Sequence, residues 1–395
     1  MSPADSRDEH ELGQLDLAQA IELFEMRGPI ALEHWLRARP QADPAIARQV
    51  RTLRDAGLLA GGVEPRERVP ERIGRYRVLR WLGAGATGVV RLALDEREAR
   101  LVAIKVLAPS FARNARLRER FDREARAIAR LEHPGIVPIL EAGVDGGLPY
   151  QVLEYVEGTS LEEGLDRLRA LVTAPAEVGA ANIAEALRLP HWAAVPPDLV
   201  RAALDWGKAI AHALAHAHER GVLHRDIKPS NVIIDTAGRA RLLDFGLARV
   251  ADDARMTWSA DLIGTPQYLA PEIIRAGIGR ADERVDVFAL GACIYEIATL
   301  TSPFDAASST RVLEAVLAHD PPRPSRINAR ASDSFDLLCA GALAKDPRRR
   351  YRDAVALADD IERVRAGEPL PPREQARWRH WLANVLSGWL ARVRG

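Results

Sequence analysis

The segment of this sequence that carries the most chemistry is HRDIKPSN, which runs from His224 to Asn231. It holds a carboxylate at Asp226, a lysine two residues later at Lys228 and an amide at Asn231. The carboxylate can accept a proton from an incoming hydroxyl group. Lys228 can neutralise charge on a phosphoryl group during its transfer, and Asn231 offers a neutral oxygen to a hard cation. Together these residue types suit the transfer of a phosphoryl group to a hydroxyl.

A second oxygen ligand lies eighteen residues after Asp226, at Asp244 in the triplet DFG. It follows the run Arg241-Leu-Leu, which predicts a strand that ends near this carboxylate. With Asn231 it would complete a site for a divalent cation. A lone aspartate is more often a solvated loop residue or a helix cap, but several matched segments in the required order argue against that interpretation here.

Three glycines, Gly83, Gly85 and Gly88, form the pattern G-x-G-x-x-G. Glycines at these places let the backbone approach a phosphate without Cβ clashes. The alternative is a dinucleotide-binding turn, in which the third glycine opens a helix. Here Gly88 opens VVRLALDE, which alternates like a strand. The pattern is weak evidence on its own, but it favours a loop between two antiparallel strands that covers phosphates from above.

Lys105 ends the strand-like run VAIK and is one of only four lysines among 55 basic residues. A retained lysine suggests that its compact point charge matters, here for phosphate oxygens; the alternative is an edge-strand lysine in solvent. A tethered lysine needs a carboxylate partner. Spacing permits Glu119 or Glu124, and we favour Glu124 because it lies beside the apolar face of the helix predicted over 112–131.

The elements that must hold these residues change in type along the chain. Residues 76–155 contain short strand-like runs separated by glycine or charged turns. After residue 158 the chain reads as mainly helical, with helix candidates at 199–220, 282–300, 308–319, 333–344 and 353–366. A small β-rich half followed by a larger α-rich half predicts an α+β fold with two lobes.

Composition narrows the class of protein. Of 395 residues 47% are apolar, enough for a sizeable core, and 55 basic residues balance 55 acidic ones, which argues against a nucleic-acid binder. Two cysteines cannot build a disulfide framework or a four-ligand zinc site. No run of about eighteen apolar residues occurs, and the polar start MSPADSRDEH does not read as a secretory signal. We therefore expect a cytoplasmic protein.

Taken in order, these segments resemble the protein-kinase family, from about Tyr76 to Arg365. Further matching segments are GTPQYLAPE at 264–272 and DVFALG, which begins at Asp286. A third is the triplet KDP, which begins at Lys345 and is followed by Arg350. The resemblance implies a two-lobed kinase fold, ATP and Mg²⁺ as cofactors, and protein substrates. Lys228 and Thr265 are similar to the serine/threonine-specific pattern, so the chain resembles a bacterial-type (eukaryotic-like) serine/threonine protein kinase.

The resemblance also implies which residues would hold ATP. Lys105 would bind the α- and β-phosphates and would be oriented by Glu124. Glu154 and Val156 would offer backbone hydrogen bonds to adenine, by an alignment that rests on YQVLEYVEG. The residues that would cover the phosphates or pack on adenine are Gly83, Gly85, Gly88, Val90 and Ala103.

The transfer machinery follows from the same resemblance. Asp226 would be the catalytic base, Lys228 would steady the γ-phosphoryl group, and Thr265 would bond to both. The remaining assignments are Mg²⁺ binding by Asn231 and Asp244 and an ion pair between Glu272 and Arg350.

The resemblance also implies control by phosphorylation, because in the family an arginine directly before the base, here Arg225, needs an anion. Thr257 and Ser259, in the loop after the DFG triplet, provide two hydroxyl groups. Arg225 and Arg249 could receive a phosphate at either of them. We expect autophosphorylation at Thr257, with Ser259 as a second site; the alternative is a loop hydroxyl of no consequence.

Two other classes of protein remain open. A pseudokinase would serve as a nucleotide-binding signalling scaffold without turnover, but its usual mark is loss of the lysine, the base or a metal ligand, and all of these are present. A small-molecule kinase would lack the segment from Gly-Thr-Pro to Ala-Pro-Glu that this chain contains.

The kinase-like region is expected over 73–366, with an N-lobe over 73–155 and a C-lobe over 156–366. An insertion at 166–198 shows scattered proline and alanine and no clear core pattern. Around this region lie a helical extension at 1–60, linkers at 61–72 and 367–376, and a tryptophan-rich amphipathic helix at 377–395. That last helix would lie on a membrane surface, dock on the chain itself, or bind a partner.

Overall fold

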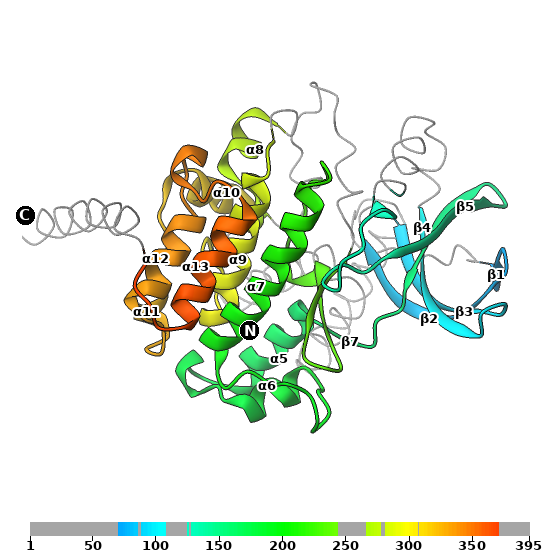
Figure 1. Cartoon of the computed structure of the whole chain (residues 1–395), viewed down its shortest axis with the longest axis horizontal. Coiled ribbons are helices and arrows are strands. Elements are labelled where there is room, and N and C mark those ends of the chain that lie inside the picture. Colours follow the sequence, from blue (N-terminus) through cyan, green and yellow to red (C-terminus); the bar gives the residue numbers. More distant parts are fainter. Residues whose placement is uncertain are drawn as a thin grey trace, which may run out of the picture.

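The computed structural model describes residues 70–85, 88–107, 125, 128–243, 266–277, 281–306 and 308–370. They form a small lobe built on a sheet and a larger helical lobe (Figure 1). The α+β class and the two-lobed arrangement predicted from the sequence are confirmed. The extensions predicted at 1–60 and 377–395 lie outside the described residues. No helix of the described ranges is long and apolar enough to cross a bilayer.

The small lobe is an antiparallel sheet with the strand order β1-β2-β3-β4-β6-β5. Its strands are β1 Arg72–Ile73, β2 Tyr76–Gly85, β3 Gly88–Asp95, β4 Arg100–Leu107, β5 Ile139–Asp145 and β6 Leu148–Glu154. Side chains alternate between its two faces. On β4, Val102, Ile104 and Val106 are buried in the core of this lobe, whereas Ala103 and Lys105 lie on the opposite face.

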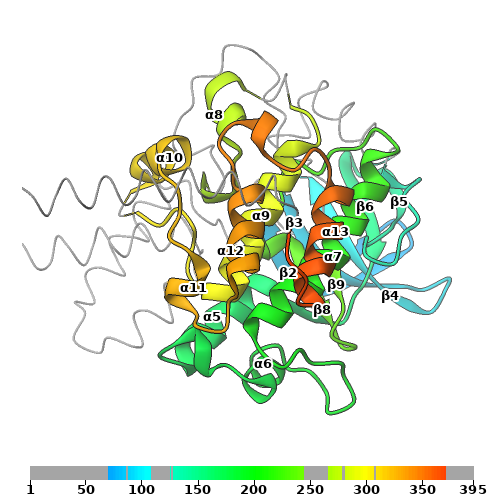
Figure 2. The same cartoon turned by 60° about the vertical axis from the view of Figure 1, so that its left-hand side comes forward.

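The large lobe consists of helices around one buried helix. They are α5 Leu161–Leu171, α6 Ala180–Ala186, α7 Leu199–His218, α8 Pro271–Ala276, α9 Arg284–Thr299, α10 Ser309–Ala318, α11 Pro324–Ile327, α12 Asp333–Ala342 and α13 Ala354–Arg365. Short 3-10 turns are η1 Pro175–Glu177, η2 Pro229–Asn231, η4 Pro266–Tyr268 and η6 Pro347–Arg349. Helix α9 is buried from Val285 to Thr299, with α7, α12 and α13 packed against it (Figure 2). A small sheet of β7 Gly158–Ser160, β8 Val232–Asp235 and β9 Ala240–Leu242 completes the lobe.

The five helices predicted from periodicity occur as α7, α9, α10, α12 and α13, each within two residues of its predicted ends. Four of them begin after a side chain that accepts a hydrogen bond from the backbone N–H three residues later. These caps are Asp198, Ser308, Ser332 and Asp353. Such caps satisfy amide groups that have no partner inside the helix, which is why the helices start there.

The segment 166–198, which shows no clear core pattern in the sequence, contributes to the core of the large lobe. Helix α5 runs through the start of this segment, and η1 and α6 follow within it. The buried apolar residues there are Leu168, Val178, Ile183, Ala186 and Leu187. Because these residues come from separate short elements, no single helical period connects them in the sequence.

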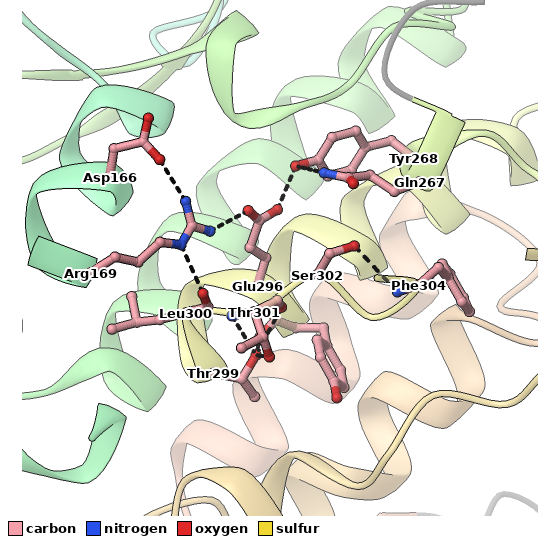
Figure 3. Close-up of polar contacts among 11 residues, drawn as sticks. Asp166, Arg169, Gln267, Tyr268, Glu296, Thr299, Leu300, Thr301, Ser302 and Phe304 are labelled. Atoms are coloured by element: carbon pink, nitrogen blue, oxygen red, sulfur yellow. Dashed lines mark hydrogen bonds and ion pairs between the residues drawn. The ribbon is translucent and has the colours of Figure 1, made fainter. Parts of the chain in front are cut away.

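Arg169, near the end of α5, forms polar contacts that join this segment to α9 (Figure 3). Its guanidinium group lies 2.5 Å from the Glu296 carboxylate of α9 and 2.8 Å from Asp166. Its Nε donates to the Leu300 carbonyl at 2.8 Å. Glu296 also accepts a hydrogen bond from the Tyr268 hydroxyl. Helices α5 and α9 and the residues before α8 therefore meet at one buried carboxylate.

Lys345 lies against aromatic side chains of the large lobe. Its Nζ is 3.8 Å from the ring centroid of Phe304 and donates to the Ala315 carbonyl at 3.4 Å. Burial lowers the pKa of Lys345 from 10.5 to about 7, although the nearby Asp320 opposes this shift. Between these two pKa values the unfolded chain binds more protons at this group than the folded chain. The contribution of Lys345 to stability therefore rises with pH across that window.

We expect the variant Lys345→Met to lose this pH dependence. The free energy of unfolding of the wild type minus that of the variant should increase between pH 7 and pH 9, by at most about 1.4 kcal/mol per pH unit. Denaturant titrations of both proteins at several pH values measure it. Lys208→Met is the control, because Lys208 forms an ion pair with Glu362 and lies beside no aromatic ring described here. Parallel pH profiles for wild type and Lys345→Met would contradict the prediction.

Candidate active site

Asp226, Lys228 and Asn231 meet at one carboxylate. Lys228 Nζ lies 3.0 Å from Asp226 Oδ2, and Asn231 Nδ2 donates to the same oxygen at 2.9 Å. The turn η2, opened by Pro229, brings Asn231 back so that its Nδ2 also donates to the Asp226 carbonyl at 2.7 Å. The side chains of Asp226 and Lys228 are each 22% exposed. The carboxylate is thus held on one side and accessible on the other, as a base for an incoming hydroxyl requires.

Asn231 also has a group that suits a metal. Its amide nitrogen makes both bonds to Asp226, and no described residue donates to its Oδ1. Leu243 N donates to the Asn231 carbonyl at 2.8 Å, so the chain passes beside Asn231 directly before Asp244. An amide oxygen and a carboxylate form a donor set that fits a hard divalent cation. Asp244 itself lies outside the described residues.

Asp286 of α9 holds the backbone of the loop that carries the base. Its two carboxylate oxygens accept hydrogen bonds from the backbone N–H groups of His224 at 2.8 Å and Arg225 at 2.7 Å. His218 Nε2 lies 2.8 Å from the same carboxylate. Arg225 has a left-handed backbone with φ of +62°, which is strained for a residue with a long side chain. The bonds to Asp286 therefore hold a strained turn directly before Asp226.

Asp286 keeps its charge although it is fully buried. Burial by itself disfavours the ionised carboxylate and would raise its pKa. The hydrogen bond from His218 and the bond from the Arg225 backbone outweigh this effect, so the pKa of Asp286 is lowered. A buried anion with three donors is a rigid support, because moving the loop would leave the charge without partners.

The face of the small sheet opposite its core presents the residues expected to contact nucleotide. Val90 on β3 is the cross-strand partner of Lys105 on β4, and Ala103 is the partner of Leu153 on β6. Directly opposed residues of an antiparallel pair lie on the same face. Lys105 is 6% exposed. Val90, Ala103 and Lys105 therefore share one surface.

The glycine pattern lies where β2 and β3 form an antiparallel pair, with Gly85 opposite Gly88. This confirms the expected strand-loop-strand arrangement and excludes the dinucleotide-binding turn, in which a helix would follow. A Cβ atom at Gly88 would lie 1.9 Å from the Val106 carbonyl oxygen, so only glycine permits this close pairing with β4. A Cβ at Gly83 would meet no atom within 4 Å, which leaves open space there.

The connection between the lobes begins at Glu154, which ends β6. Its backbone N–H donates to the Pro138 carbonyl at 3.1 Å, and its side chain forms a two-pronged ion pair with Arg241 of β9 at 2.7 and 3.2 Å. Val156 is 8% exposed, and no described residue accepts a hydrogen bond from its amide. That amide is therefore available to a ligand, as the alignment with adenine contacts requires.

The sequence alone does not indicate two of these supports. Arg241 lies in the run before the DFG triplet, and its pairing with Glu154 spans 87 positions. Asp286 matches a family landmark, but the sequence does not indicate its bonds to the loop. The only signal for Arg241 in the sequence is one charged residue in an otherwise apolar run.

The structure leaves several assignments untested. Outside the described residues lie Glu124, Asp244, Thr257, Ser259 and Thr265. Their roles stay predictions. The expected pair of Glu272 and Arg350 is confirmed: two bonds of 2.7 and 3.0 Å join them, and the Arg350 side chain is fully buried.

Residues 76–360 match the family described as the protein kinase domain. The match covers most of the chain and contains every active-site residue discussed above. The chain therefore belongs to the protein kinase family. The family implies ATP as a substrate and the use of a divalent metal.

Comparison with individual relatives shows which protein kinases the chain is similar to. It is 35% identical over 311 residues to the serine/threonine-protein kinase PknL of Mycobacterium tuberculosis, which covers 77% of this chain and 71% of PknL. It is 34% identical over 289 residues to PrkC of Bacillus subtilis, which covers 73% of this chain and 40% of PrkC. The crystal structure of the PknI kinase domain of Mycobacterium tuberculosis superposes with a TM-score of 0.53 at 27% identity, over 74% of this chain and 96% of that domain. These relatives confirm the prediction of a bacterial, eukaryotic-like serine/threonine protein kinase, a phosphotransferase that acts on proteins.

Proposed function

We propose that this chain transfers the γ-phosphoryl group of Mg²⁺-bound ATP to serine and threonine hydroxyls of other proteins, with Asp226 as the base. The observation that supports this most strongly is the geometry at Asp226. Its carboxylate is oriented by Asn231 Nδ2 at 2.9 Å, lies 3.0 Å from the Lys228 ammonium, and is partly exposed. A base, a cation and a metal ligand are thus within one short loop.

The transfer step follows from this arrangement. The substrate hydroxyl oxygen bonds to the γ-phosphorus, the bond from that phosphorus to the bridging oxygen of ADP breaks, and the hydroxyl proton passes to Asp226. Lys228 neutralises charge on the phosphoryl oxygens during the transfer. Mg²⁺, held by Asn231 and Asp244, would supply further charge neutralisation. Most of the rate comes from positioning, which the bonds from Asp286 to the loop help to provide.

The competing proposal is a scaffold that binds nucleotide without turnover. The direct test is transfer of labelled phosphate from ATP to the chain itself and to a generic protein substrate, with Mg²⁺ or with excess chelator. We expect label on protein serine and threonine only when Mg²⁺ is present. Nucleotide binding without any label would favour the scaffold instead.

The surroundings of Arg225 support control by loop phosphorylation. Arg225 is exposed, forms no ion pair with a described residue, and lines a cavity together with Tyr268, Leu269 and Ile273. A guanidinium group without an acidic partner is a suitable receptor for a phosphate. The loop between the DFG triplet and Thr265 contains the hydroxyls of Thr257 and Ser259.

We expect the active enzyme to phosphorylate its own Thr257, with Ser259 as a second site. Mass spectrometry of the wild type after incubation with Mg²⁺ and ATP should find phosphate there. The variant Thr257→Ala should lower kcat on a protein substrate, because the anion that Arg225 would bind is lost, and Arg225→Ala should remove the difference between treated and untreated enzyme. Active, ATP-treated enzyme with both hydroxyls unmodified would contradict this control mechanism.

A further inference from the structure

The short connection between the two lobes is fixed at both ends by the hairpin of β8 and β9. Strand β6 ends at Glu154, and β7 begins four residues later. At the far end of the connection, the Thr236 N–H donates to the Glu157 carbonyl at 3.2 Å. At the near end, Arg241 of β9 pairs with the Glu154 carboxylate through contacts of 2.7 and 3.2 Å. A connection this short has little conformational freedom once both ends are held.

Arg241 reaches the connection because side chains alternate along β9. Ala240 and Leu242 are buried in the core of the large lobe, so the Arg241 side chain leaves the strand on the opposite face. Its Nη2 also donates to the Ile136 carbonyl at 3.5 Å, whereas its buried Nε bonds to no described residue. Within the described ranges, Glu154 is the one carboxylate that pairs with Arg241. A two-pronged pair of this kind fixes orientation as well as distance.

The group held between the two fixed ends is the backbone amide of Val156. Val156 is 8% exposed, and its N–H donates to no described residue. A hydrogen bond weakens steeply when its angle or distance departs from the preferred values. The affinity for a flat ring that accepts from this N–H therefore depends on where the connection places it. The ion pair of Arg241 lies only two residues before this amide.

We propose that Arg241 is a positioning residue for the nucleotide: by pairing with Glu154, it holds the connection so that the Val156 N–H bonds to the adenine ring. The guanidinium group acts through the Glu154 carboxylate and not on the nucleotide itself. This inference rests on the proposed binding of ATP at the connection. It goes beyond that proposal because it assigns part of the affinity for adenine to a residue of the large lobe.

The variant Arg241→Met tests the proposal, since methionine keeps a long side chain but removes the charge and all donors. Its affinity for a non-hydrolysable ATP analogue with Mg²⁺ should fall about threefold to tenfold, the equivalent of one charge-assisted hydrogen bond. Adenosine, which has no phosphates, should lose affinity by the same factor, because only the adenine contact is misplaced. Isothermal titration calorimetry measures both affinities. The KM for ATP should rise while kcat at saturating ATP stays close to wild type, because Asp286 still holds the base loop.

Two further variants separate positioning from a general loss of stability. Arg241→Lys keeps the charge and should recover part of the affinity for the analogue and for adenosine. Glu154→Gln keeps the backbone at the connection but removes the carboxylate, so it should weaken binding by about the same factor as Arg241→Met. The double variant should bind no more weakly than either single variant, because both changes break one pair. Additive losses in the double variant would overturn the proposal.

Arg239→Met is the matched control. Arg239 belongs to the same hairpin and pairs with Asp235 at 2.9 Å, but its side chain is 74% exposed and does not contact the connection. It should bind the analogue and adenosine as the wild type does. Unchanged affinities in Arg241→Met, or an equal loss in Arg239→Met, would overturn the proposal. If Arg241→Met does not fold, Glu154→Gln alone decides, because its partly exposed side chain can be replaced without opening the core.

Failure of this inference is distinguishable from failure of the proposed function. If the wild type binds neither the ATP analogue nor adenosine, the assignment of the nucleotide site is wrong. If the wild type binds both and Arg241→Met binds them equally well, only the role of Arg241 is wrong.

Discussion

Asp226→Asn is expected to reduce kcat by about a hundredfold to ten-thousandfold, the range that a general base contributes. The asparagine amide keeps the shape of the side chain but cannot take the hydroxyl proton. Lys228 and Asn231, which now bond to the carboxylate at 3.0 and 2.9 Å, would keep their places. The KM for ATP should therefore change little. Steady-state kinetics with a protein substrate at saturating Mg²⁺ measure both constants.

Asp359→Asn serves as the control for that variant, because it makes the same change at an exposed position of α13. It should have wild-type kinetics. A kcat within a few-fold of wild type in Asp226→Asn would show that the base lies elsewhere. Equal losses of nucleotide binding and of kcat would instead indicate that the loop had lost its structure.

Asp286→Ala is expected to destabilise the protein strongly and also to lower kcat. Removal of this carboxylate leaves the N–H groups of His224 and Arg225, and the ring of His218, without their buried acceptor. Loss of one partner in such a buried cluster costs about 3–5 kcal/mol. The strained turn at Arg225 would also relax and displace the base. Denaturant unfolding measures the first effect, and kcat of the protein that remains folded measures the second.

The effect of Asp286 on stability should depend on pH in a definite direction. Its pKa in the folded protein is lowered relative to the ordinary value of 3.8. Its ionised form therefore contributes stability above about pH 4, and this contribution is lost as the pH falls through the folded-state pKa. The difference in unfolding free energy between wild type and Asp286→Ala should be constant near neutral pH and should shrink in acid. Asp359→Ala, at an exposed position of α13, should be close to neutral at all pH values. A loss in Asp286→Ala no larger than that of Asp359→Ala would contradict the support role.

The parts of the active site that could be predicted from the sequence are those that lie close together in the chain. Asp226, Lys228 and Asn231 occupy one short segment, so a single proline-opened turn is enough to bring them together. The glycine pattern likewise lies within one hairpin, and strand alternation after Gly88 was enough to choose between a phosphate-covering loop and a dinucleotide turn. Helix ends could be predicted because caps such as Asp198 and Asp353 act over three residues.

Burial could not be predicted where it depends on neighbours that are distant in sequence. Residues 166–198 show no helical period, yet Val178 and Ile183 are fully buried. The same segment is joined to α9 by Arg169, near the end of α5, which pairs with Glu296, a residue 127 positions later. No local pattern contains that information.

The sequence by itself determined the class of chemistry, the order of the two lobes, and the residues that carry a base, a cation and a metal ligand, because local spacing and hydrophobic period encode these features. Only the tertiary structure decided how those residues are held. Asp286 supports the base from 60 positions away, and Arg241 joins β9 to Glu154 across 87. The physical reason is that hydrogen bonding and charge compensation in a buried site are properties of three-dimensional neighbours, whereas the sequence records only neighbours along the chain.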